Sequence, residues 1–90
     1  MNIETTIAHI LVDDLFVEVP PSQIGPDDSL RDVLGVDSLG FTELRAQCEH
    51  AFDITISDED FVPEHFSSIR TLTNLVAGLR APLPDTAGNR

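Results

Sequence analysis

Three stretches of the chain carry apolar residues at the three- and four-residue spacing of a single helix face. The first stretch covers residues 3–16, the second begins at residue 38, and the third begins near residue 67 or 68. The three stripes consist of Ile3, Ile7, Ile10, Leu11 and Leu15; of Phe41, Leu44, Cys48 and Phe52; and of Ile69, Leu72, Leu75, Val76 and Leu79. Each stripe needs another to cover it, so the pattern predicts an all-α fold, a small bundle of three to four helices.

The connector between the first two helices, residues 17–37, is long and breaks the helical period. It contains "VPPSQIGPDDS", in which prolines, a glycine and short polar residues disfavour a helix. Apolar residues nevertheless recur through it, at Ile24, Leu30, Val33, Leu34 and Val36. A loop of this length is usually functional or packed onto the core. We expect an ordered, packed loop, with a turn of helix over residues 29–34 that Gly35 ends.

The segment after the second helix is the hardest to interpret. Ile54 and Ile56 alternate briefly, but the chain offers no partner strand, so an extended connector is expected. Ser57 and Pro63 suit the start of a short third helix. Serine is a preferred N-cap, and we expect Ser38 to cap the second helix and Ser67 or Ser68 to cap the last one.

Charge restricts the classes of partner. The 90-residue chain has 16 acidic residues against five arginines and no lysine, for a net charge of -11. Nucleic acids and anionic membranes select basic surfaces, so neither is an expected partner. A strongly acidic surface favours proteins with basic patches. The acidic clusters at residues 27–28 and 58–60 do not fit a calcium loop, and no metal site is expected.

The organisation of the chain is expected to be simple. Residues 1–81 form one domain, and residues 82–90, rich in proline and without periodicity, form a flexible tail. Cys48 is alone, which excludes an internal disulfide, and its position predicts a buried side chain. No stretch is long and apolar enough to span a bilayer, and "MNIETTIAHI" does not resemble a secretion signal. We therefore expect a cytoplasmic monomer.

Ser38 is the residue that suggests chemistry. A nucleophilic serine needs a base within hydrogen-bond reach, but His50 is twelve residues further along the same helix. His9 and His65 could approach only through tertiary packing, and no G-x-S-x-G motif is present. Enzymatic activity is therefore disfavoured. A hydroxyl at a helix N-terminus, with free N–H donors and the positive end of the dipole, suits a phosphate ester added by another protein.

The stretch "GVDSLGFTEL" resembles the G-x-D-S-L signature of the acyl carrier proteins, and the likeness runs from about Ile3 to Leu79. The resemblance implies that a magnesium-dependent phosphopantetheinyl transferase attaches 4'-phosphopantetheine from coenzyme A to Ser38, next to Asp37. The terminal thiol of this arm would then hold acyl groups as thioesters. A carrier of this kind catalyses no reaction; its tether raises the effective concentration of the cargo at the enzymes that it meets.

The resemblance also implies a docking face for acyl-loading, synthase or tailoring enzymes with basic patches. The exposed side of the second helix would present Leu39, Thr42, Glu43 and Ala46, and acidic contacts would come from Glu49 and Asp60. The small side chains of Thr42 and Ala46, and the positive charge of Arg45, depart from the usual pattern of the family. These departures indicate a dedicated set of partner enzymes.

The nature of the cargo stays open at the level of sequence. "SDEDFVPEHFSSIRTL" resembles discrete carriers of polyketide or mixed polyketide–peptide pathways in secondary metabolism, such as antibiotic biosynthesis, including carriers of unusual extender units such as methoxymalonyl. A peptidyl or aminoacyl carrier is the alternative among carriers. An unmodified acidic helical module that binds basic proteins would explain the charge and the stripes equally well, but not the placement of "GVDSL".

Overall fold

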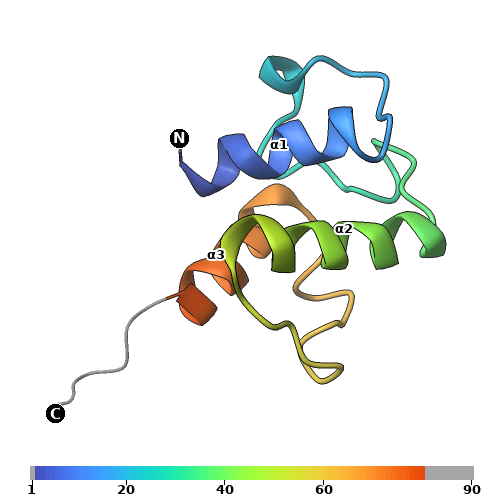
Figure 1. Cartoon of the computed structure of the whole chain (residues 1–90). Coiled ribbons are helices and arrows are strands. Elements are labelled where there is room, and N and C mark those ends of the chain that lie inside the picture. The colour runs from blue at the N-terminus through green and yellow to red at the C-terminus, as the bar shows by residue number, and fades with distance from the viewer. Residues whose placement is uncertain (1, 81–90) are drawn as a thin grey trace, which may run out of the picture.

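The computed structural model describes residues 2–80, which form three α-helices joined by ordered connectors (Figure 1). The helices are α1 (Ile3–Asp13), α2 (Ser38–Phe52) and α3 (Ile69–Arg80), and a 3-10 turn, η1, covers Pro21–Gln23. Figure 1 shows α1 and α2 running in roughly opposite directions, with the long loop between them at the end where α2 begins. No strand occurs within residues 2–80, so the predicted all-α fold is confirmed. The predicted tail, residues 82–90, lies outside the described residues.

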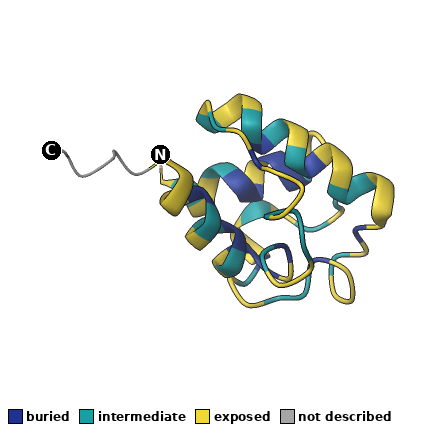
Figure 2. Cartoon of the chain, turned by 90° about the horizontal axis from the view of Figure 1, so that it is seen from below, coloured by how far each residue is buried: buried dark blue, intermediate teal, exposed yellow. Residues whose placement is uncertain are grey.

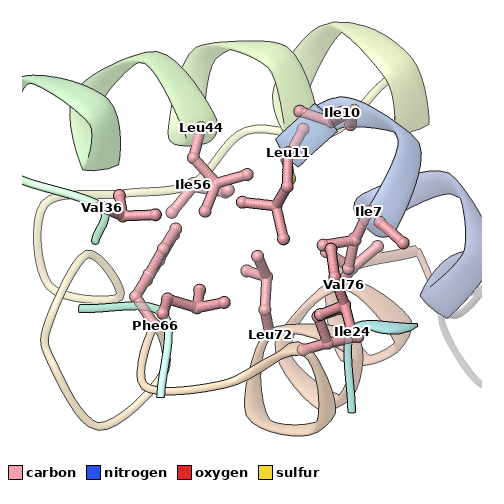
Figure 3. Close-up of a cluster of buried hydrophobic side chains, with 14 residues drawn as sticks. Ile7, Ile10, Leu11, Ile24, Val36, Leu44, Ile56, Phe66, Leu72 and Val76 are labelled. Atoms are coloured by element: carbon pink, nitrogen blue, oxygen red, sulfur yellow. The ribbon is translucent and has the colours of Figure 1, made fainter. Parts of the chain in front are cut away.

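The core is built from the predicted stripes together with the connectors. All three helices contribute side chains to a common interior, and their buried faces turn away from solvent (Figures 2 and 3). The buried stripe residues are Ile7, Ile10 and Leu11 of α1, Leu44 and Cys48 of α2, and Ile69, Leu72 and Val76 of α3. Leu79 was predicted in the stripe of α3 but is exposed in the last turn of the helix.

The first helix ends three residues earlier than its apolar pattern predicts. It begins at a cap, where the side chain of Asn2 accepts the Thr5 amide at 2.7 Å. At its other end, the amides of Leu15 and Val17 bond back to the carbonyls of Ile10 and Leu11, across loops wider than a helical turn. Phe16 adopts a left-handed backbone conformation with φ of 60°. This conformation turns the chain out of the helix, although Leu15 still packs against the core.

The long loop is ordered because both side chains and backbone hold it. Ile24, Leu30 and Val36 are buried, as predicted, whereas Val33 faces solvent. Backbone bonds join the Leu30 amide to the Ser67 carbonyl at 3.0 Å and the Arg70 amide to the Pro26 carbonyl at 2.8 Å. The Arg70 guanidinium also bonds the Asp27 carboxylate through two nitrogens, at 2.6 and 3.1 Å. These contacts attach the loop to the start of α3.

Two turns occur where helices were considered. The predicted helical turn after Ser29 is a single hydrogen-bonded turn, with the Val33 amide 2.9 Å from the Ser29 carbonyl, and Gly35 ends it with φ of 74°. The candidate third helix is absent from residues 57–68, which form successive turns instead. Pro63 accounts for the end of any helix begun at Ser57, because it disfavours helical geometry in the residue before it. The residues after Pro63 form only turns, although proline is compatible with the first turn of a helix.

The last helix begins at Ile69 and is capped by Ser68, one of the two predicted caps. The Ser68 hydroxyl accepts the Thr71 amide at 3.2 Å, and the Thr71 hydroxyl accepts the Ser68 amide at 3.1 Å. This reciprocal pair has the geometry of a capping box. It fixes the point at which the turn-rich segment ends and α3 starts.

Candidate functional site

The start of α2 is capped by Asp37, not by Ser38 as predicted. The Asp37 carboxylate accepts the Gly40 amide at 2.8 Å, and its backbone is extended, as an N-cap requires. Ser38 is therefore the first residue inside the helix. Either residue could cap the N-terminus of α2, and Asp37 does so because it directly precedes the first helical residue.

As a result, the Ser38 hydroxyl lies at a helix N-terminus and does not serve as the helix cap. The side chain of Ser38 is exposed, and none of its hydrogen bonds to residues 2–80 involve the hydroxyl; only its carbonyl is engaged, by the Thr42 hydroxyl at 3.1 Å. The amides of the first helical residues have no partner within the helix, which leaves donors and the positive end of the helix dipole beside this oxygen. The site is suited to an anionic substituent.

A groove of about 440 Å³ lies beside Ser38. One wall is the first turns of α2, with Ser38, Phe41 and Thr42, and the other is the turn-rich segment around Phe61 and Phe66. The three phenylalanine rings stack edge to face, with centroids 6.5 Å apart for Phe41 and Phe66 and 5.1 Å apart for Phe61 and Phe66. The part of the groove formed by these rings is thus apolar.

Polar residues from the long loop also line the groove. They are Ser29, Arg31 and Asp32, and Arg31 is exposed. Among the described residues, Arg45 and Arg70 form ion pairs with carboxylates and Arg31 forms none. No histidine lines the groove, so it lacks the histidine base that commonly activates a nucleophilic serine. The sequence pattern did not indicate the groove, since the residues of its two walls are far apart along the chain.

Arg45 does not present its charge to solvent as its position in the sequence suggested. Its guanidinium donates to the Ile56 carbonyl at 3.0 Å and pairs with Asp58 at 3.0 Å. It also lies over the ring of Phe61, 4.9 Å from the centroid. The positive charge of Arg45 is thus used to hold the segment after α2 against the helix.

The predicted docking residues fall into two groups. Leu39, Thr42, Glu43 and Ala46 are all exposed along one side of α2, and Leu39 is 79% exposed. Glu49 and Asp60 are half-buried and have partners within the chain. The Glu49 carboxylate accepts the Ile56 amide at 2.8 Å, and the Asp60 carboxylate accepts the Ser57 hydroxyl at 3.2 Å. The first group is free for a partner protein, whereas these two acids also stabilise the connector.

Cys48 is buried, as predicted, and burial is the main reason that the pKa of its thiol rises to about 12, with a smaller contribution from the charge of Glu49. A thiol of this kind is protonated at neutral pH and unreactive. Over residues 2–80, no three histidine, cysteine or acidic side chains gather as a metal site would require. In the same part of the chain, none of the helices has the length and apolar character needed to cross a membrane.

Comparison with known protein families and sequences agrees with this geometry. The family model described as "Phosphopantetheine attachment site" matches residues 6–76, which include all of the loop, α2 and the groove. An acyl carrier protein of Solidesulfovibrio magneticus is 40% identical over 60 residues, covering 67% of this chain and 74% of its own. An acyl carrier protein of Streptomyces coelicolor is 39% identical over 77 residues, covering 84% and 77% of the two chains.

Solved structures share the fold. One, described as the apo form of KstB-PCP, matches with a TM-score of 0.71 and 32% identity over 90% of this chain and 89% of its own. Another is a carrier protein from Agrobacterium tumefaciens, in complex with an engineered glycine:[carrier protein] ligase from Bradyrhizobium japonicum. It matches with a TM-score of 0.75 and 27% identity over 83% of this chain and 96% of its own. The helical fold, the residues around Ser38 and these relatives agree, and the chain belongs to the acyl carrier proteins, which hold a covalent phosphopantetheine and are not themselves catalysts.

Proposed function

We propose that Ser38 is the residue to which phosphopantetheine is attached, and that the protein carries acyl groups on this arm. The observation that supports the proposal most directly is that Ser38, at the start of α2, is exposed and its hydroxyl does not cap the helix. Because Asp37 satisfies the Gly40 amide, a substituent on the Ser38 oxygen breaks no hydrogen bond within the protein. Modification at this position therefore costs little stability.

The residues around Ser38 fit both parts of the arm. The phosphate of the arm is an anion, and the N-terminus of α2 and the guanidinium of Arg31 offer it positive charge and N–H donors. The apolar groove gives a surface to the carbon chain of the arm or of its cargo. When attached, the group supplies a terminal thiol that forms thioesters, and this chain's own residues hold and present it.

The attachment step needs a separate enzyme. The Ser38 oxygen would form the new bond to phosphorus, adenosine bisphosphate would leave from coenzyme A, and a base must take the hydroxyl proton. No histidine lines the groove, Asp37 is occupied as a cap, and residues 2–80 contain no cluster that would hold a metal ion. We assign the base and the magnesium ion to a phosphopantetheinyl transferase, as the resemblance to the family implies.

Intact-mass spectrometry tests the attachment. The purified protein is incubated with coenzyme A, magnesium and a broad-specificity phosphopantetheinyl transferase, and we expect a mass increase of one phosphopantetheinyl group. Ser38→Ala should abolish the increase. Ser67→Ala is the matched control, because Ser67 is also an exposed serine of the same groove, and it should load normally. Loading of Ser38→Ala, or no loading of the wild type, would exclude the proposal.

We further propose that partner enzymes approach along the exposed side of α2 and read its acidic charge. Glu43 is exposed on this side, and its carboxylate accepts only the side chain of Gln47, at 2.7 Å. In the protein that already holds the arm, Glu43→Lys should slow acylation by the acyl-loading enzyme at low salt and leave the thermal midpoint nearly unchanged. Glu4→Lys, an equal charge change on α1, is the control and should be acylated at the wild-type rate. Equal rates for all three proteins would show that α2 charge is not recognised.

For the cargo, we propose an acyl group of the polyketide type, on the basis of the segment from Ser57 to Leu72. An aminoacyl cargo is the second candidate, since a carrier 27% identical to this chain occurs in complex with a glycine:[carrier protein] ligase. The mass of the protein purified from its native host distinguishes the two. A thioester mass that fits a carboxyacyl or acyl unit supports the first, and a mass that fits an amino acid supports the second.

A further inference from the structure

Large apolar side chains gather on the surface beside Ser38. Phe16 is 80% exposed and Val33 is 60% exposed, and Leu39, directly after Ser38, is 79% exposed. Phe16 follows α1 and Val33 lies in the segment before α2, and both line one hollow of about 470 Å³. Figure 1 shows these two loops meeting at the end of the molecule where α2 begins. We call Phe16 and Val33, with the hollow between them, the Phe16 patch.

The backbone of Phe16 makes its exposure more informative. A φ of 60° is favourable for glycine but costs about 1–2 kcal/mol for a residue with a side chain. Glycine would end α1 here without strain and without placing an aromatic ring in water. The position thus combines a strained backbone with an exposed aromatic ring, and glycine would avoid both. This combination points to a use of the ring at the surface.

The patch borders the proposed attachment residue on the side opposite the groove. The first turn of α2 contributes Gly40 to the hollow, whereas it contributes Ser38 and Phe41 to the groove. The hollow also contains two carboxylates, those of Glu18 and Asp37. Two exposed apolar side chains with carboxylates beside them fit a partner surface that presents an apolar side chain flanked by lysine or arginine.

We propose that the Phe16 patch is a docking surface for the phosphopantetheinyl transferase. This inference rests on the proposed modification of Ser38. An apolar side chain of the transferase lies between Phe16 and Val33, and its basic residues face Glu18 and Asp37. This surface is separate from the exposed side of α2, on which Thr42, Glu43 and Ala46 lie.

Geometry favours the transferase over the enzymes that use the loaded arm. The phosphorus that it transfers must come within bonding distance of the Ser38 oxygen, so its surface must cover the residues around Ser38. A standard interface buries roughly 800 Å² on each partner, a disc of about 16 Å radius. An interface of that size around the start of α2 includes the patch. Later enzymes meet the far end of a long arm and have more freedom in where they dock.

The test measures loading by a phosphopantetheinyl transferase that modifies the wild type, with coenzyme A as donor. Phe16→Gly removes the ring and relieves the backbone, and Val33→Ser reduces the patch from its other side. Leu79→Ala is the control, since Leu79 is an exposed apolar residue in the last turn of α3, and Figure 1 shows this end of α3 away from the end of the molecule where α2 begins. Phe16→Leu keeps an apolar side chain at the same φ and should restore most of the activity.

We expect kcat/KM to fall roughly 5- to 30-fold for Phe16→Gly, mainly through KM for the carrier, and at least threefold for Val33→Ser, in the range of interface hot spots. Leu79→Ala should stay within twofold of the wild type. If Phe16→Gly falls less than fivefold, the docking role is refuted, while the loading of the wild type still supports modification of Ser38. A wild-type dimer in solution that Phe16→Gly converts to a monomer would assign the patch to self-association and overturn the proposal.

Discussion

Substitutions of Asp37 can separate two contributions to the stability of α2: the hydrogen bond of the cap and the negative charge at the helix N-terminus. In the wild type, its carboxylate accepts the Gly40 amide at 2.8 Å, and its negative charge lies at the positive end of the helix. Asp37→Ala removes both interactions. Asp37→Asn removes only the charge, because asparagine caps a helix about as well as aspartate.

The expected loss of stability follows from these two terms. A cap replaced by alanine costs about 1 kcal/mol, and a charge at an exposed helix terminus contributes about 0.3 kcal/mol, at the lower end of its range. Asp37→Ala should therefore lower the free energy of unfolding by about 1–1.5 kcal/mol. For a domain of this size, each kcal/mol corresponds to roughly 4–8 °C in Tm. Asp37→Asn should lose only a few tenths of a kcal/mol.

Urea and thermal unfolding followed by circular dichroism at 222 nm measure both variants under identical conditions. The reasoning also makes a prediction for salt: the deficit of Asp37→Asn should shrink in high salt, whereas that of Asp37→Ala should largely remain. If Asp37→Ala unfolds with the wild-type free energy, Asp37 is not the working cap. Ser38 would then be the residue that caps α2, and its hydroxyl would not be free as the structure describes it.

Three further outcomes are expected. Cys48, with its thiol pKa raised to about 12, should not react with a disulfide reagent at pH 8 in the apo protein, and loading with phosphopantetheine should add one reactive thiol; reaction of the folded apo protein would contradict its burial. Leu44→Ala should cost about 3–5 kcal/mol by urea unfolding and Leu44→Met less than about 1.5 kcal/mol, since Leu44 is fully buried; equal losses would show that this site tolerates a cavity. The Arg70 side chain bonded to Asp27 lowers the pKa of that carboxyl, so the contribution of the pair is present above the ordinary aspartate pKa and is lost as the pH falls through the lowered value. The small Tm deficit of Asp27→Asn at pH 7 should therefore disappear in acid, and a deficit that persists at low pH would have another origin.

The helical stripes could be predicted from the sequence because burial follows a local period. Ile7, Leu44 and Leu72 lie at the spacings that one helix face requires, and all three are fully buried. That the long loop is ordered could also be predicted, because apolar residues such as Leu30 and Val36 are expected to pack onto the core and not to lie in a solvated linker. Local patterns of this kind carry information about the core wherever one face is covered.

The competition between neighbouring polar groups was not predictable in the same way. Asp37 and Ser38 are both preferred caps, and only the position at which the helix starts decides which of them is used. The end of α1 was misplaced for a similar reason, because Leu15 continues the apolar stripe although Phe16 leaves the helix. In both cases the pattern was correct, and backbone geometry determined the outcome.

The groove and the Phe16 patch depend on contacts between distant parts of the chain. Phe41 and Phe66 are separated by a connector without regular structure, and Phe16 and Val33 by most of the long loop. No periodicity links such residues. The role of Arg45 could not be predicted either. Its partner is the Ile56 carbonyl, and the sequence does not specify where the backbone after α2 directs that group.

The two walls of the groove differ in what holds them in place. α2 is a continuous helix whose displacement would disturb the core at Leu44 and Cys48, whereas residues 57–68 are short turns attached through Arg45, the phenylalanine edges and a few backbone bonds. A substituent on Ser38 that enters the groove would displace these turns at a lower cost than α2, because no helix has to unwind. Phe66 sets the limit to such a displacement, since its ring belongs to the core.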